Sequence, residues 1–145
     1  MINKFDGDHR FLSNFYLVRI EYEGIVYPST EHAYQAAKFL DKSIRENISR
    51  FEKPGKAKYY PRKNPDKIRP DWDKVKVSIM HDLLVKKFSI PFLRTMLYNT
   101  GEEPIVEGNT WHDNFWGNCT CEDCSGIYGE NRLGRLLMII RDRIE

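Results

Sequence analysis

The chain has 145 residues, a formal net charge of +2 and three cysteines. This length suits one domain with a hydrophobic core, and the small net charge gives the whole molecule no strong electrostatic character. The longest apolar run, residues 136–140, cannot cross a bilayer, and residues 1–10 lack the apolar core of a secretion signal. An odd number of thiols is not the framework of a secreted disulfide protein. We therefore expect a cytoplasmic protein without a membrane segment.

Apolar and charged residues alternate over residues 18–23, Glu23-Gly24 offers a turn, and Ile25-Val26-Tyr27 continues beyond it, which predicts a β-hairpin over residues 18–27. Ser29 or Thr30 can then cap a helix that we expect over about residues 31–48. One side of this helix is apolar, and the other carries polar or aromatic side chains at helical spacing: Glu31, Tyr34, Gln35 and Lys38.

Residues 53–74 form the most basic part of the chain, with eight Lys or Arg against three Asp. Two tyrosines and Pro61, Pro65 and Pro70 interrupt the charges, so this segment is a poor helix candidate. We expect a loop that faces phosphate groups, and a solvated linker is the alternative.

Two helices are predicted after the basic segment. Asp71 can cap the first, whose apolar stripe begins at Trp72. Pro91 suits the first turn of the second, whose inward face we expect to carry Phe92, Leu93, Met96 and Leu97.

The chain ends with an extended piece at 105–106, an irregular segment and a helix over about residues 131–144. The pattern as a whole predicts one mostly helical α+β domain, residues 1–145, with a small β-hairpin.

Residues 108–118 hold the least usual mixture of side chains: two tryptophans, a histidine, an aspartate and three asparagines between two glycines. This mixture suits a loop that stacks a flat ring and forms hydrogen bonds with its edges. A surface turn with buried aromatic anchors is the alternative. Farther on, the glycine-rich residues 126–134 could present backbone N–H groups to a phosphate, whereas Asn131 could instead cap the last helix.

Two carboxylates are candidates for catalysis. Glu31 lies in the first turn of its helix, where a negative charge is favoured, and Asp113 is the natural partner. Such a pair can stabilise positive charge on a sugar and position water, and His112 could supply a proton. Trp72 and Trp116 can stack on a base or a ribose. The alternatives are a surface glutamate, a histidine that only accepts hydrogen bonds and a tryptophan in the core.

Cys119, Cys121 and Cys124 form a Cys-x-Cys-x-x-Cys pattern. Zinc sites usually need two such halves, and here His112 would have to complete the set from seven residues upstream. The sequence therefore favours a reduced thiol cluster and no metal, with a zinc site as the weaker alternative.

Five segments in the same order resemble the YbiA-like NADAR family, whose name refers to NAD and ADP-ribose. The segments are residues 11–15 (Phe-Leu-Ser-Asn-Phe), 27–39 (Tyr-Pro-Ser-Thr-Glu-His-Ala-Tyr-Gln-Ala-Ala-Lys-Phe), 72–76 (Trp-Asp-Lys-Val-Lys), 114–117 (Asn-Phe-Trp-Gly) and 129–138 (Gly-Glu-Asn-Arg-Leu-Gly-Arg-Leu-Leu-Met). The resemblance implies a largely helical YbiA-like fold and an N-glycosidase that hydrolyses a bond between ribose C1 and nitrogen. The cysteine triplet lies where the YbiA branch has a glycine-rich stretch. This difference concerns the specificity for the leaving group.

The resemblance also implies roles for individual residues. Glu31 matches the catalytic glutamate, and Asp113 matches an acidic position before the Trp-Gly motif. The other matched positions bind substrate: Asn14, Lys38, Trp72, Trp116 and Asn131, to which we add His112. We expect no cofactor.

The substrates of the family allow two interpretations of the enzymatic activity. We expect removal of ADP-ribose from guanine, free or within DNA or RNA, and the alternative is hydrolysis of ribosylamino intermediates of riboflavin biosynthesis. A non-catalytic ADP-ribose or nucleotide reader, or a nucleic-acid-binding module built on residues 53–74 and the cysteines, would not need Glu31. No protein partner is implied.

Overall fold

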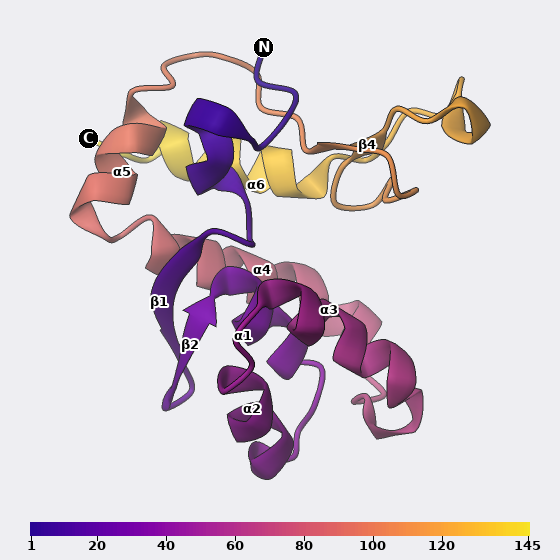
Figure 1. Cartoon of the computed structure of the whole chain (residues 1–145). Helices are drawn as coiled ribbons and strands as arrows, with labels where there is room; N and C mark the ends of the chain where they lie inside the picture. Colours follow the sequence, from indigo (N-terminus) through magenta and orange to yellow (C-terminus); the bar gives the residue numbers. More distant parts are fainter. The chain divides into compact units, whose positions relative to one another are not determined.

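The computed structural model describes all 145 residues, which form two compact units (Figure 1). One unit is the continuous stretch Asn14–Ser89, and the other combines Met1–Ser13 with Ile90–Glu145. None of the helices has both the length and the apolar composition that a membrane span requires.

The unit Asn14–Ser89 begins with the predicted hairpin. Strands β1 (Leu17–Tyr22) and β2 (Ile25–Ser29) pair antiparallel. Glu23 and Gly24 between them both have positive φ, 49° and 86°, which a two-residue type I′ turn requires. The hairpin prediction is therefore confirmed.

Helix α1 (Thr30–Ala36) starts where the sequence predicts, because the Ser29 hydroxyl accepts a hydrogen bond from the backbone N–H of His32 at 3.1 Å. Every residue of α1 is buried. The helix contacts both strands of the hairpin and all three other α-helices of its unit (Figure 1). Side chains on α1 are therefore held from several sides.

The prediction of one helix over residues 31–48 is wrong, because α1 ends at Ala36 and α2 (Lys42–Ser49) begins anew. The backbone oxygen of Lys38 accepts from the Arg69 N–H at 2.7 Å, and that of Phe39 accepts from the Arg45 side chain at 2.6 Å. These carbonyls bind distant donors instead of continuing the helical pattern.

The expectation of a loop over residues 53–74 is also wrong. This segment forms α3 (Pro54–Lys63), a short 3-10 helix η2 (Pro65–Lys67) and the start of α4 (Trp72–Lys87). Pro54 and Pro65 stand at helix starts, where proline is tolerated, whereas Pro61 lies inside α3 and removes one helical hydrogen bond near its end.

Helix α4 confirms the prediction of a helix after Asp71, but not the expected cap. The Asp71 carboxylate instead accepts two hydrogen bonds from Arg69, at 2.7 and 3.0 Å. This bidentate pair fixes the approach to α4.

The second unit contains α5 (Pro91–Tyr98), α6 (Arg132–Asp142) and four short elements. Those elements are the 3-10 helices η1 (Gly7–Leu12) and η3 (Glu122–Cys124) and the parallel pair β3 (Gly108–Asn109) and β4 (Asn118–Cys119). Both predicted helices are confirmed, as is the extended piece at Ile105, which bridges to Ile2. Phe92 and Met96 are more exposed than expected, at 52% and 36%.

Helices thus dominate the protein, with one antiparallel hairpin and one minimal parallel pair. This architecture confirms the predicted class, a mostly helical α+β fold.

Candidate active site

Glu31 is a buried carboxylate in the first turn of α1, with 7% of its surface exposed. Its backbone N–H donates to the Asn14 carbonyl at 2.9 Å, and its Oε1 accepts from the Gln35 side-chain amide at 2.8 Å. The second bond joins residues four apart, as the helical spacing of the sequence predicts. Glu31 is therefore held at both its backbone and its side chain.

An aromatic pair, Tyr34 and Trp72, and the lysine Lys38 belong to the same unit as Glu31. The rings of Tyr34 and Trp72 meet edge to face with their centroids 5.1 Å apart. The Lys38 Nζ lies 5.6 Å from the Tyr34 ring centroid and 5.7 Å from that of Trp72. Trp72 is only half-buried, so its role is not limited to filling a core.

The ammonium group of Lys38 is influenced by several charges. Burial lowers the pKa of Lys38 from its ordinary value, the Glu31 carboxylate opposes this shift, and the charges of Arg62, Lys76 and Lys58 reinforce it. One carboxylate and three cations therefore act in opposite directions on the pKa of Lys38.

Two buried amide oxygens of this unit, Asn14 Oδ1 and Gln35 Oε1, have no hydrogen-bond partner within the protein. The remaining contact of the Asn14 amide is a weak one, from its Nδ2 to the Met80 sulfur at 3.6 Å. An unsatisfied buried acceptor costs about 1–3 kcal/mol, so such an atom is expected to bind a water molecule or a ligand group. Both belong to residues bonded directly to Glu31, and both can accept hydrogen bonds from hydroxyl or amino groups of a ligand.

His32, next to Glu31, has a structural role that sequence reasoning missed. Its Nε2 lies 2.9 Å from the Phe51 carbonyl oxygen and its Nδ1 lies 2.7 Å from the Ser29 hydroxyl. Because a carbonyl can only accept, Nε2 carries the proton and Nδ1 accepts from the hydroxyl. Burial lowers the pKa of His32, which agrees with this neutral form. The Ser-x-x-His spacing at the helix start was the available signal.

Lys87 is a second residue that the sequence did not single out. It is fully buried on α4, and burial lowers the pKa of its ammonium group to about 7. Its Nζ lies 5.6 Å from the Tyr16 ring centroid and 5.1 Å from that of Phe88. No local pattern distinguishes Lys87 from the exposed lysine beside it.

Asp113, the predicted second carboxylate, belongs to the other unit and shapes a turn there. Its Oδ1 accepts from the backbone N–H groups of Phe115 at 3.0 Å and Trp116 at 2.8 Å. The Asn109 side chain brackets the backbone of Asp113, accepting from its N–H at 3.1 Å and donating to its carbonyl at 2.8 Å. The ring centroids of Phe115 and Trp116 lie 4.9 Å apart.

The other amides of the aromatic segment also bind the protein's own backbone. Asn114 Oδ1 accepts from the Cys119 N–H at 2.9 Å, and Asn118 Oδ1 accepts from the Gly129 N–H at 2.8 Å. These two amide oxygens therefore hold an irregular turn together.

Asn131 has left-handed backbone geometry, with φ of 50°, and does not cap α6 through its side chain. Its amide instead accepts from the Glu107 N–H and donates to the Ile105 carbonyl, both at 2.9 Å. The backbone N–H groups of residues 131–133 already donate to the carbonyls of residues 115–117. A phosphate at this helix start is therefore not supported.

The structure thus sorts the predicted site residues into two groups. Asn14, Glu31, Lys38 and Trp72 belong to the unit Asn14–Ser89. The other unit holds the remaining predicted residues, namely His112, Asp113, Trp116, Asn131, Cys119, Cys121 and Cys124.

This chain is similar to known proteins over nearly its whole length. The NADAR domain family model matches residues 2–145. The N-glycosidase YbiA of Escherichia coli (strain K12) is 36% identical over 138 residues, which cover 94% of this chain and 82% of that protein. The Riboflavin biosynthesis protein VVA0006 of Vibrio vulnificus is 34% identical over 142 residues, 97% of this chain but 37% of that longer protein.

The fold also matches a solved structure. The NMR structure of the E. coli protein YbiA superposes with a TM-score of 0.81 at 34% identity, over 98% of this chain and 83% of that one. The sequence resemblance and the expected YbiA-like fold are both confirmed. The chain therefore belongs to the NADAR domain family and is a glycosyl hydrolase of the N-glycosidase kind.

Proposed function

We propose that this N-glycosidase removes ADP-ribose from guanine by hydrolysing the bond between ribose C1 and the base nitrogen. The observation that carries the proposal is the buried Glu31 carboxylate, next to two amide oxygens without partners. Those oxygens, on Asn14 and Gln35, suit the hydroxyl groups of a ribose, whose C1 would then lie close to Glu31.

Glu31 acts in the ionised form. The start of a helix favours a negative charge by about 0.3–1 kcal/mol, and the N–H donor of Gln35 favours it further. The carboxylate stabilises positive charge that develops at C1 and orients the attacking water. The C1–N bond breaks, the water oxygen joins C1, and one proton of that water ends on the released base.

The cations around Lys38 support a substrate rich in phosphate. Three further basic residues act on its ammonium group, namely Lys58, Arg62 and Lys76. Together these four positive charges suit the pyrophosphate of ADP-ribose better than a single phosphate. Trp72 adds an aromatic face beside them, and stacking of a base is worth roughly 1–3 kcal/mol.

A ribosylaminopyrimidine phosphate is the second candidate substrate. The name of the Vibrio vulnificus relative favours it, because that protein is described as a riboflavin biosynthesis protein. This chain spans only 37% of that relative, so the name does not decide the substrate of the shared part. A non-catalytic nucleotide reader is the remaining candidate, and it would bind ADP-ribose without cleaving a bond.

The decisive experiment offers both substrates to the purified full chain. One is an oligonucleotide with ADP-ribosyl-guanine, and the other is a ribosylaminopyrimidine phosphate. Mass spectrometry detects the released sugar phosphate together with the second product, which is unmodified guanine from the oligonucleotide and the free base from the pyrimidine substrate. We expect free ADP-ribose and unmodified guanine from the oligonucleotide, at a rate well above that with the pyrimidine substrate.

Each other outcome has a separate meaning. Release of the base from the pyrimidine substrate alone would show that the substrate is the riboflavin intermediate and not ADP-ribosyl-guanine. Binding of ADP-ribose without release of either base would favour the reader. Binding to unmodified DNA that weakens steeply with salt would favour a nucleic-acid-binding module.

We further propose that residues 1–145 act as one functional domain, in a reducing compartment such as the cytoplasm. The family model spans both units, and all three thiols are free. Expression of residues 14–89 alone should therefore give no N-glycosidase activity.

A further inference from the structure

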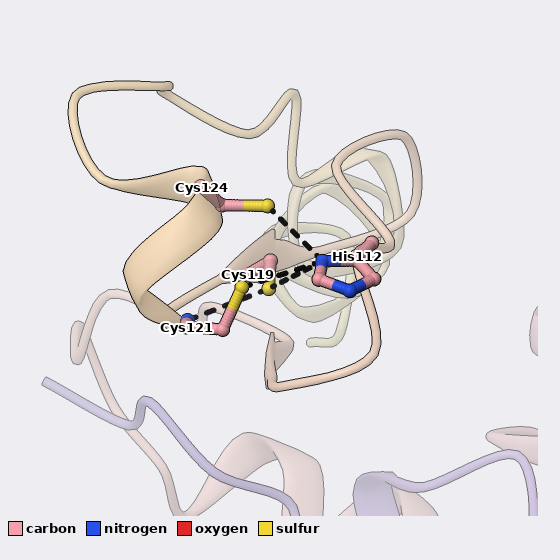
Figure 2. Close-up of side chains that lie close together, drawn as sticks. All are labelled: His112, Cys119, Cys121 and Cys124. Carbon is pink, nitrogen blue, oxygen red and sulfur yellow. Dashed lines mark hydrogen bonds between the residues drawn. The ribbon is translucent and has the colours of Figure 1, made fainter.

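We propose that His112, Cys119, Cys121 and Cys124 bind one structural zinc ion. Figure 2 shows the three cysteine side chains pointing toward the imidazole ring of His112. All four residues belong to the unit formed by Met1–Ser13 and Ile90–Glu145. Their nitrogen and sulfur atoms lie within 4.8 Å of one another.

The separations fit a tetrahedral zinc site. With zinc–sulfur bonds of about 2.3 Å and zinc–nitrogen bonds of about 2.0–2.1 Å, a tetrahedron places nitrogen and sulfur about 3.6 Å apart. The His112 Nδ1 lies 3.3 Å from the Cys121 sulfur, 3.4 Å from that of Cys124 and 3.9 Å from that of Cys119. These three distances bracket the value that a shared ion requires.

Hydrogen bonds alone do not account for this arrangement. The Nδ1 of an imidazole carries either one proton or one lone pair, so it can form only one strong hydrogen bond. Here three sulfur atoms surround the same nitrogen of His112. A disulfide would join two of the thiols, leave the third unpaired and make no use of the imidazole. A metal ion uses all four groups.

Two N–H groups of the protein donate hydrogen bonds to sulfur atoms of the cluster. The Asn114 amide donates to the Cys124 sulfur at 3.5 Å, and the backbone N–H of Cys121 donates to the Cys119 sulfur at 3.5 Å. Such donors are typical of metal–thiolate sites, where they stabilise the negative charge on sulfur.

His112 also has a backbone conformation that few non-glycine residues adopt, with φ of 67°. This geometry is unfavourable by about 1–3 kcal/mol and persists only where other interactions hold it. Coordination through Nδ1 supplies such an interaction, because it fixes the ring against the three sulfur atoms.

The fold explains how a ligand seven residues upstream of Cys119 reaches the site. Strands β3 and β4 pair in parallel, with Asn109 opposite Cys119, and the chain between them loops out through His112. Sequence spacing alone argued against His112 as the fourth ligand. The pairing of β3 with β4 brings His112 beside the thiols.

Four protein ligands fill the coordination sphere of zinc, so the site has a structural role. A His112 ring that binds zinc is not available as a proton donor, and this assignment replaces the catalytic role considered for it. The ion would join η3 to the turn that Asp113 holds together.

The test starts with untagged full-length protein, purified with a thiol reductant and without chelator. Inductively coupled plasma mass spectrometry should find about one zinc per chain. Exchange for Co²⁺ should give the visible absorption of tetrahedral cobalt and a thiolate-to-cobalt charge-transfer band. Zinc-free protein should melt at a lower temperature, and zinc but not magnesium should restore the transition.

Two variants identify the ligands. His112→Asn and Cys124→Ser should each weaken zinc binding at least about a hundredfold, more than loss of an outer-shell partner would. His81→Asn is the matched control, since His81 lies on α4 in the other unit, and it should keep a full complement of zinc.

Wild-type protein that contains no zinc, and whose reduced form takes up none in competition with a chromogenic chelator, would overturn the proposal. So would an intramolecular disulfide found by mass spectrometry in protein purified without reductant but with zinc present. His112→Asn with unchanged affinity would remove the imidazole from the site. Because the wild-type metal content decides the main question, variants that fail to fold do not block the test.

Discussion

In the unit Asn14–Ser89, polar side chains of the candidate site lie on regular helices. In residues 108–131 of the other unit, polar side chains instead form the hydrogen bonds that hold an irregular segment together. Glu31 and Gln35 are placed by one turn of α1, and an amide oxygen of Gln35 is left without a partner. In residues 108–131, by contrast, the side-chain oxygens of Asp113 and Asn114 accept hydrogen bonds from backbone N–H groups.

The difference teaches how to separate ligand-binding amides and carboxylates from structural ones. Both regions are rich in the same residue types, and both match family motifs. In the aromatic segment the side-chain oxygens are used within the protein, so removing them should change stability first. Around Glu31 buried acceptors stay open, so substitutions there should change activity first.

The largest expected effect comes from Glu31→Gln. Glutamine keeps the volume of the side chain and an oxygen that can accept from Gln35, but it loses the negative charge. Turnover should fall at least about a hundredfold while the melting temperature and the affinity for ADP-ribose stay close to wild type. Steady-state kinetics and calorimetric titration measure the two effects.

Glu21→Gln is the matched control, because Glu21 is exposed on β1 of the same unit. It should leave turnover unchanged. Near-normal turnover in Glu31→Gln would remove Glu31 from the mechanism and favour a binding module.

Gly117→Ala tests whether the aromatic segment is held as tightly as its hydrogen bonds indicate. An added Cβ would overlap the carbonyl and carboxylate oxygens of Glu107, and that carbonyl also accepts from the Asn118 N–H at 2.8 Å. The free energy of unfolding should fall by about 1–3 kcal/mol in chemical denaturation.

Gly55→Ala is the control for Gly117→Ala, because a Cβ at Gly55 in α3 meets no atom within 4 Å. It should raise the free energy of unfolding by about 0.5–1 kcal/mol, since alanine favours a helix. Equal effects of the two substitutions would show that the segment around Gly117 yields freely.

Asp113 gives the sharpest separation of structure from chemistry. Asp113→Asn keeps the oxygen that accepts from Phe115 and Trp116, so the melting temperature should not change. If its charge contributes to catalysis, as the family motif predicts, turnover should fall about tenfold. Asp113→Ala should in addition lower stability by about 1–3 kcal/mol. Normal turnover in Asp113→Asn would limit the residue to its turn.

The sequence predicted those parts of the fold that depend on neighbouring residues. The hairpin follows from Glu23-Gly24, the start of α1 from Ser29, and the Glu31–Gln35 contact from helical spacing. Each of these interactions spans four residues or fewer, so a local pattern contains it.

The errors arose where distant residues decide the local structure. The chain leaves α1 after Ala36 because Arg69 and Arg45 bind the next carbonyls. Residues 54–63 form a helix although Pro61 lies inside it, so counting prolines is a poor guide to this segment. The open amide oxygen of Asn14 and the approach of His112 to the thiols depend on contacts that no local pattern contains.

The division of the chain has a consequence for its synthesis. Residues 14–89 leave the ribosome as one uninterrupted stretch, so every contact within that unit can form as soon as its last helix emerges. Ile2 bridges to Ile105, so the N-terminal residues must wait for about a hundred later ones before their own unit can close. We expect the helical unit that holds Glu31 to be completed first during translation, and the cysteine-containing unit to fold later, once the residues that follow Ile90 have emerged.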